Sequence, residues 1–213
     1  MFRDRKDAGE QLASSLAEYA DRSDVLVLAL PRGGVTTGFE IARRLRAPLD
    51  VLIVRKMGAP SQPELAIGAV SETGTVVLNR DIISALDIDE HYIEKEIARQ
   101  KVEITRRVSL YRKGKALPVL RSKTVILVDD GVATGATITA AIDTLKRECL
   151  EGLVAALPVS PPETAHVLDK MVDEFLCLET PADFMAVGSY YEDFTQVSDE
   201  EVVALLQNDR AGK

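Results

Sequence analysis

The 213-residue sequence has few of the residues that build covalently linked or metal-bound scaffolds. It contains two cysteines, two histidines and no tryptophan, and aromatic residues make up 5% of the chain. Cys149 and Cys177 are too few and too scattered for a disulfide framework or a cysteine-based zinc site. Both cysteines stand among apolar neighbours, so we expect two buried, reduced thiols.

The sequence also lacks a long apolar segment and an excess of positive charge. No apolar run approaches the ~20 residues that a membrane-spanning helix needs, and residues 1–7 are highly charged without an apolar leader core. We therefore expect a cytoplasmic protein without a membrane partner. The net charge of −8 argues against general nucleic-acid binding, because neutralising phosphates needs a basic surface.

Hydrophobic patterning predicts an α/β fold. Apolar runs of strand length alternate with segments whose apolar residues recur at helical spacing. This alternation favours a parallel sheet with right-handed helical crossovers. We predict strands at 25–30, 49–54, 125–128, 152–159 and 174–178, and helices at 7–20, 35–45, 138–145, 161–171 and 198–206.

The stretch between residues 55 and 121 breaks this alternation. Its first part is rich in glycine and proline, and its last part mixes acids and bases around one apolar face. We predict a mobile loop at 55–68, a hairpin at 68–79, a short helix at 81–86 and a long charged helix at 89–112.

These features suggest one domain over residues 1–213 with two additions. Residues 66–121 form a hairpin and long-helix insert, and residues 180–213 form a small C-terminal hood and helix. The packed face of the long helix offers a subunit interface, and we expect a homodimer.

The most informative segment joins the predicted strand 125–128 to the helix 138–145. Asp129 and Asp130 follow the strand directly, and residues 131–137 are mostly small. Amide groups at a helix N-terminus bind phosphate with the help of the helix dipole, and small residues allow its close approach. The segment is therefore a candidate phosphate-binding loop; a plain strand, turn and helix is the alternative.

The spacing excludes the two commonest phosphate loops. Gly131 and Gly135 are four residues apart without a following lysine, so the segment is no P-loop, and a GxGxxG pattern is absent. Two carboxylates beside a phosphate cradle suit a ligand with both sugar hydroxyls and a phosphate, such as ribose 5-phosphate.

This segment resembles the phosphoribosyl-pyrophosphate (PRPP) signature of type I phosphoribosyltransferases: four apolar residues, two acids, two variable residues, then Ala-Thr-Gly-x-Thr. The resemblance implies a mainly parallel five-stranded sheet flanked by helices, with a helical and hairpin insert and a C-terminal hood. It also implies transfer of ribose 5-phosphate from PRPP to a nitrogenous base, with release of pyrophosphate and with Mg²⁺ as cofactor.

The resemblance assigns the ribose 5-phosphate to the central segment. Asp129 and Asp130 would act in catalysis by holding the ribose hydroxyls, and would hold Mg²⁺ through water. Thr134 and Thr137 add hydroxyl donors, and either could cap the following helix. The residues that would hold the 5-phosphate are Gly131, Val132, Ala133, Thr134, Gly135, Ala136 and Thr137.

The stretch Pro31-Arg32-Gly33-Gly34 matches the pyrophosphate loop of the family. Gly33 and Gly34 would bind pyrophosphate through backbone amides, and Arg32 would take part in catalysis. The family often has a cis peptide here, which we expect at Arg32–Gly33. A simple glycine turn between strand and helix is the alternative.

Arg55 and Lys56 end the second predicted strand, where family members carry a loop that closes over the reacting centre. Cations beside departing pyrophosphate stabilise its developing negative charge. Lys56 is therefore a candidate catalytic residue and Arg55 a candidate substrate-binding residue; an exposed basic pair is the alternative.

The stretch 180–194 concentrates aromatic residues and is similar to the base-binding segment of purine phosphoribosyltransferases. On this match Phe184 would stack on a planar base, and the backbone near Met185 would read the edge of that base. Core packing beneath a C-terminal cap is the alternative.

The sequence departs from the hypoxanthine–guanine branch of the family at two places. Ala133 stands where those enzymes carry an aspartate, and Pro158-Val159-Ser160 stands where they carry a lysine that reads a 6-oxo group. A small-molecule base of purine-like shape remains the favoured acceptor, with its identity open. Two other functions stay open: a regulator that senses PRPP or a nucleotide without turnover, and a hydrolase of phosphorylated ribose compounds.

Overall fold

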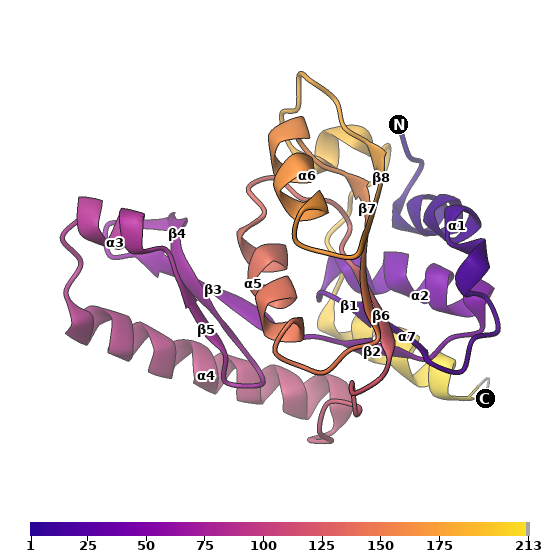
Figure 1. The fold of residues 1–213 in the computed structure, drawn as a ribbon, viewed down its shortest axis with the longest axis horizontal. Helices are drawn as coiled ribbons and strands as arrows, with labels where there is room; N and C mark the ends of the chain where they lie inside the picture. The colour runs from indigo at the N-terminus through magenta and orange to yellow at the C-terminus, as the bar shows by residue number, and fades with distance from the viewer. Residues whose placement is uncertain (212–213) are drawn as a thin grey trace.

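The computed structural model describes residues 1–211, apart from the side chains of residue 64 and residues 209–211. Its centre is a parallel sheet with the strand order β2–β1–β6–β7–β8 (Figure 1). The predicted five-stranded parallel sheet is therefore confirmed. The strands are β1 (Val25–Ala29), β2 (Leu49–Val51), β6 (Thr124–Val128), β7 (Gly152–Val159) and β8 (Glu174–Glu179).

Helices cover both faces of this sheet, which explains why β1 and β6 read as unbroken apolar runs (Figure 1). On one face lie α1, α2 and α7, and on the other lie α5 and α6. Alternate strand residues supply the two resulting cores. The bounds are α1 (Arg5–Ser15), α2 (Gly33–Leu45), α5 (Ala136–Leu145), α6 (Pro162–Asp169) and α7 (Asp199–Ala211).

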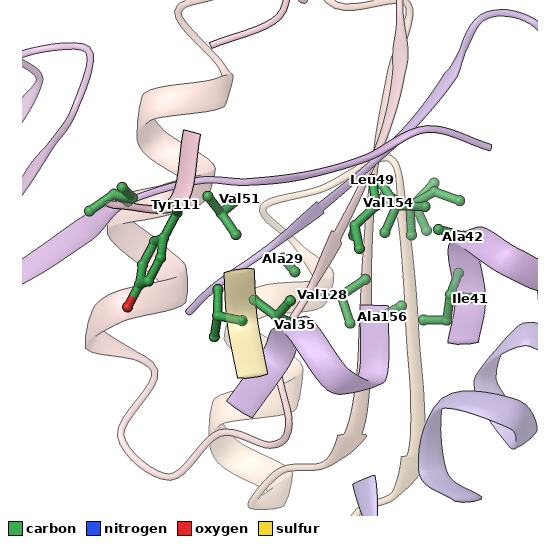
Figure 2. Close-up of a cluster of buried hydrophobic side chains, with 14 of the residues drawn as sticks. Ala29, Val35, Ile41, Ala42, Leu49, Val51, Tyr111, Val128, Val154 and Ala156 are labelled. Atoms are coloured by element: carbon green, nitrogen blue, oxygen red, sulfur yellow. The ribbon is translucent and has the colours of Figure 1, made fainter. Parts of the chain in front are cut away.

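The core beneath α2 is made of tightly buried aliphatic residues from helix and strands (Figure 2). Figure 2 also shows Tyr111, which comes from a distant helix and joins the edge of this cluster. The labelled members from α2 and the sheet are Ala29, Val35, Ile41, Ala42, Leu49, Val51, Val128, Val154 and Ala156.

A second, antiparallel sheet and two helices project to one side of the main sheet, and we call residues 54–112 the insert arm (Figure 1). Its long helix α4 packs against β3 and β4 and also contacts α7. The elements are β3 (Val54–Ala59), β4 (Gln62–Ser71), β5 (Val76–Leu78), α3 (Arg80–Ala85) and α4 (Glu90–Arg112).

The prediction of a mobile loop at 55–68 was wrong, because this stretch forms the hairpin of β3 and β4. Its apolar side chains Met57, Ala59 and Ile67 are buried in the core, and that burial orders a segment whose composition is typical of loops. The second main-sheet strand is also shorter than predicted, ending at Val51.

A buried charge cluster ties the insert arm to the main sheet. Arg112, the last residue of α4, is fully buried and forms ion pairs with Glu72 and, at 4.0 Å, with Asp50 of β2. Glu72 also accepts a hydrogen bond from the Ile53 amide at 2.8 Å. Glu72, which lies within the predicted hairpin 68–79, is thus the counter-charge of a buried arginine.

The two cysteines differ from each other. Cys149 is exposed in the turn after α5, so its predicted burial was wrong. Cys177 lies half-buried in β8, where burial raises the pKa of its thiol to about 11. Within the part of the chain that the structure describes, no helix is both long and apolar enough to cross a membrane.

Candidate active site

The candidate active site lies at the carboxyl edge of the main sheet, where ligands bind in open parallel α/β sheets. Neighbouring strands β1 and β6 end here, and the Leu30 amide donates to the Val128 carbonyl at 2.9 Å. This bond carries the pairing past the end of β1. It therefore brings the stretch 31–34 against Asp129 and Asp130.

The predicted pyrophosphate loop forms the beginning of α2, which starts at Gly33 and not at Val35 as predicted. The amides of Gly33 and Gly34 thus occupy the first helical positions, where backbone donors have no partner within the helix. A cis peptide is present in this loop, but at Pro31–Arg32 and not at the predicted Arg32–Gly33. The helix N-terminus offers a place for a polyanion.

Both glycines are required by the close approach of the two acids. A Cβ atom at Gly33 would overlap the Asp130 carboxylate, and one at Gly34 would lie 2.9 Å from the Asp129 Cα. Such contacts do not occur for real side chains. The loop at 31–34 and the acids at 129–130 therefore form one packed unit.

The two acids are not equivalent. Burial, followed by the neighbouring Asp130 carboxylate, raises the pKa of Asp129 well above its ordinary value. Asp129 Oδ1 accepts the Asp130 amide at 2.9 Å. Asp130 instead forms an ion pair with Arg5, whose Nε donates to Oδ2 at 2.6 Å.

The loop at 131–137 is held by contacts on both sides. The Val132 amide donates to the Val159 carbonyl at 2.9 Å, and the Thr164 hydroxyl donates to the Ala133 carbonyl at 3.0 Å. Gly131 and Gly135 have φ angles of +139° and +77°, which favour glycine. These contacts fix the backbone in front of α5.

Helix α5 begins at Ala136 with Gly135 as its N-cap, and no side chain caps it. The suggestion that Thr134 or Thr137 caps this helix was therefore wrong. The amides at the start of α5 point out of the helix end, as a phosphate site requires. Two helix N-termini, those of α2 and α5, thus flank the acid pair.

The candidate cations on β3 have different surroundings. Arg55 Nε donates to Gln100 Oε1 of α4 at 3.1 Å, and burial followed by the charge of Arg107 lowers the pKa of Arg55. Lys56 follows on the opposite strand face, which it shares with Val54. Val54 belongs to the core that includes α5. The Arg55 side chain therefore points toward α4, and Lys56 lies on the strand face that points away from α4.

A groove of about 410 Å³ separates the insert arm from α5. Its walls come from β4, β5 and the start of α3 on one side, and from Ala136, Thr139 and Ala140 of α5 on the other. The insert arm thus stands beside the helix that begins at the candidate phosphate loop.

The predicted base-binding segment lies in a third cluster at the same edge, built from both chain ends. Phe184 stacks on Tyr190 with ring centroids 5.5 Å apart, and Met185 is 86% exposed. Phe2 pairs with Tyr191 in a short β-bridge, so the N-terminus completes the hood.

Sequence reasoning missed three residues that support this edge. Arg5 pairs with Asp130, the Tyr191 hydroxyl donates to the Asp130 carbonyl at 2.6 Å, and Thr164 holds Ala133. Each lies more than 30 positions from its partner, as the separations of 125, 61 and 31 residues show. The aromatic concentration around Tyr191 was the one signal that pointed to this cluster.

Metal binding at this edge would rest on few protein ligands. Among the described residues, no group of three or more His, Cys, Asp or Glu side chains is placed to hold a metal ion. Two adjacent carboxylates beside helix N-termini fit Mg²⁺ that arrives with a phosphorylated ligand, since this ion usually takes one or two carboxylates plus substrate oxygens.

Residues 3–195 match the phosphoribosyl transferase domain, so the chain belongs to the phosphoribosyl transferase family. Two Mycobacterium tuberculosis proteins, from strains CDC 1551 and H37Rv, are 46% identical over 211 residues. Both are named "Putative phosphoribosyl transferase", and the match covers 99% of this chain. The chain spans about half the length of these curated relatives, 47% in each case.

Two solved structures resemble this chain in fold. The crystal structure of TT1426 from Thermus thermophilus has a TM-score of 0.83 and 44% identity, covering 97% of this chain and 98% of that one. The AQ2163 protein from Aquifex aeolicus has a TM-score of 0.52 at 11% identity, covering 83% of this chain and 73% of that one, and shares the fold.

Proposed function

We propose that this chain is a Mg²⁺- and PRPP-dependent transferase that moves ribose 5-phosphate to a nitrogenous base of purine-like shape. The observation that carries the proposal is the meeting of two helix N-termini and two carboxylates at one sheet edge. Gly34 approaches the Asp129 backbone so closely that the two halves of the site are packed directly against each other. A ligand with phosphate at each end and hydroxyls between matches this arrangement.

In this proposal the start of α2, at Gly33 and Gly34, receives the pyrophosphate with Arg32. The loop 131–137 and the start of α5 receive the 5-phosphate. Asp129 and Asp130 hold the ribose hydroxyls and, through water, Mg²⁺, which neutralises part of the pyrophosphate charge when bound.

The reaction breaks the bond between the ribose C1 and the pyrophosphate oxygen, and forms a bond from C1 to a nitrogen of the base. The base loses one proton, and pyrophosphate leaves with the electron pair. An oxocarbenium-like transition state needs positioning and charge neutralisation more than a covalent nucleophile. Lys56, on the strand face away from α4, is proposed to stabilise the departing charge.

The hood at 180–194 supplies the proposed base site. Phe184 presents an aromatic ring that stacks on Tyr190, and we propose that a planar base stacks in this cluster beside the exposed backbone at Met185.

One observation favours a second function, a regulator that binds PRPP or a nucleotide without turnover. Ser160 follows β7 at the place where the 6-oxopurine enzymes carry a base-reading lysine, and it is fully buried with its hydroxyl donating to the Pro161 carbonyl. This position therefore offers no side chain to a base. The regulator predicts saturable PRPP binding without pyrophosphate release for any base.

Calorimetric titration with PRPP, with and without Mg²⁺, tests the proposal. We expect Mg²⁺-dependent binding by the wild type and its loss in Asp129→Asn/Asp130→Asn. The exposed pair Asp87→Asn/Asp169→Asn makes the same two replacements away from the site and should bind as the wild type does. Absence of PRPP binding by the wild type would contradict the transferase and a PRPP-binding regulator. Pyrophosphate release in a screen of bases would separate the transferase from the regulator.

A further inference from the structure

Arg5 is an unusual residue for the first turn of a terminal helix, because its charged side chain is only 10% exposed. Arginine is seldom buried unless it is paired. Its partner is Asp130, 125 positions away, whose Oδ2 accepts the Arg5 Nε proton at 2.6 Å. Helix α1 thus places a positively charged side chain at the carboxyl edge of the sheet.

The guanidinium is held from two further sides. It lies over the Phe194 ring, with its central carbon 3.8 Å from the ring centroid, and Nη1 donates to the Thr195 carbonyl at 2.8 Å. A cation over an aromatic face is attracted by the ring quadrupole. Three fixed contacts therefore determine where the Nε–H bond points.

Asp130 is also held through its own backbone. Its backbone carbonyl accepts from Tyr191, and its backbone amide donates to Asp129. On the carboxylate, Oδ2 faces both Arg5 and the Gly33 backbone. With main chain and one oxygen fixed, the side chain keeps little rotational freedom.

The ion pair with Arg5 uses only part of the hydrogen-bond acceptor capacity of the Asp130 carboxylate. An ionised carboxylate offers about four acceptor sites, of which the Arg5 Nε–H uses one. The Asp130 side chain remains 16% exposed. Asp130 can therefore accept a hydrogen bond from a sugar hydroxyl while its ion pair with Arg5 stays in place. Arg5 thus supports the carboxylate without blocking it.

We infer that Arg5 is a positioning residue: it holds the Asp130 carboxylate in the orientation that accepts a ribose hydroxyl of PRPP. This inference rests on the proposed function and deepens it, because it makes the first helix part of the ligand site. The fork of the guanidinium contributes to this role, since lysine would supply the charge without the second, orienting contact to Thr195.

The test measures PRPP affinity in Mg²⁺ and thermal unfolding for wild type, Arg5→Met, Arg5→Lys and Arg3→Met. Arg3 is the matched control, because it carries the same charge two residues away but is 71% exposed and paired with Asp7 at 3.0 Å. We expect Arg5→Met to weaken PRPP binding by about 10–100-fold, as loss of an orienting partner typically does. Arg5→Lys should be intermediate, and Arg3→Met unchanged.

A cycle with Asp130→Asn separates positioning from general support of the fold. If Arg5 acts through the carboxylate, Arg5→Met should have little further effect on PRPP affinity in the Asp130→Asn background. An equal loss in both backgrounds would overturn the inference, and so would wild-type affinity in Arg5→Met. Should Arg5→Met fail to fold, wild-type affinity in Arg5→Lys would overturn it.

The control measurement on the wild type keeps the two proposals apart. A wild type that does not bind PRPP overturns the proposed function, and the inference falls with it. A wild type that binds PRPP while Arg5→Met binds equally well leaves the proposed function standing and overturns the inference alone.

Discussion

The carboxyl edge of the main sheet and the insert arm reach their structures in different ways. At the edge, glycines and helix starts, which short stretches of sequence specify, shape the backbone of loop 31–34 and segment 129–137. Distant residues such as Arg5 and Tyr191 then support this backbone. In the arm, order depends on side chains that are far apart in the chain. Arg112 meets Glu72 across 40 positions and also meets Asp50 of β2.

The difference shows that the recognisable sequence motifs and the buried charge cluster that stabilises the fold lie in separate parts of this chain. The edge carries the proposed chemistry with few buried charges besides Asp129, Asp130 and Arg5. At the root of the arm, a fully buried arginine meets two nearly buried carboxylates, Glu72 of the arm and Asp50 of β2. Variants at the edge should therefore weaken ligand binding more than stability. Variants at the root of the arm should lower stability more than ligand binding.

The largest effect on stability is expected for Arg112→Met. Removing one partner of a buried ion pair leaves its counter-charges, Glu72 and Asp50, uncompensated, which costs about 3–5 kcal/mol. Urea denaturation measures the free energy of unfolding. Arg106→Met, whose arginine is 52% exposed, is the control and should cost about 0–1 kcal/mol. Equal losses for the two variants would contradict the assigned importance of the buried cluster.

Gly33→Ala should show the opposite balance, with loss of PRPP binding as the main result. The added methyl group would overlap the Asp130 carboxylate and displace it together with Arg5. Overpacking costs about 1–3 kcal/mol of stability, and the displaced acid should abolish binding in a PRPP titration. Gly152→Ala is the control, because its methyl group would meet Thr124 Cγ2 at an ordinary 3.7 Å. Binding retained in Gly33→Ala would separate the glycine loop from the acid pair.

Tyr191→Phe gives a smaller effect at the same edge. It removes the hydroxyl that donates to the Asp130 carbonyl at 2.6 Å, while the ring contacts with Phe2 and Phe194 remain. We expect a loss of about 1 kcal/mol in the free energy of unfolding. Tyr190→Phe is the comparison, since that ring stacks on Phe184 and should keep its position. Greater destabilisation by Tyr190→Phe would reverse the assigned roles.

Glu103→Gln should have the smallest effect, confined to α4 and dependent on pH. Hydrogen bonds from Arg106 and Arg107 lower the pKa of Glu103 from 4.5 to about 2. Because the folded-state pKa is lowered, the stabilisation is present above pH 4.5 and is lost as the pH falls to about 2. At pH 7 the variant should lose at most about 1 kcal/mol, and this difference should shrink toward zero as the pH falls through about 2. A difference that does not shrink over this range would show that charge is not its cause.

Much of the fold could be predicted from local patterns. The strands 125–128 and 152–159 and the long helix near 89–112 agree with β6, β7 and α4 within one or two residues. The last helix, predicted to begin at 198, starts with a capping box: the Ser198 amide donates to Glu201 at 2.6 Å, and the Glu201 amide donates to the Ser198 hydroxyl at 3.1 Å. These features depend on residues within one turn or one strand of each other.

The failures have a common physical origin. The stretch 55–68 has the composition of a loop, yet burial of Met57 and Ile67 makes it a hairpin. Cys149 has apolar neighbours in sequence but ends in an exposed turn. In each case the local composition did not determine the structure. The hairpin at 55–68 depends on contacts with other elements, and Cys149 is exposed because none of the elements that the structure describes covers it.

The sequence by itself determined the parallel sheet, the acid pair at the end of its central strand and the glycine-rich loops beside it. These follow from apolar periodicity and from backbone conformations that few residue types adopt. Only the tertiary structure decided that Arg5 would meet Asp130 and that Arg112 would be buried with Glu72 and Asp50. The position of a charged residue in the sequence does not indicate its ion-pair partner. That partner is selected by the packing of helices and strands that lie far apart in the chain.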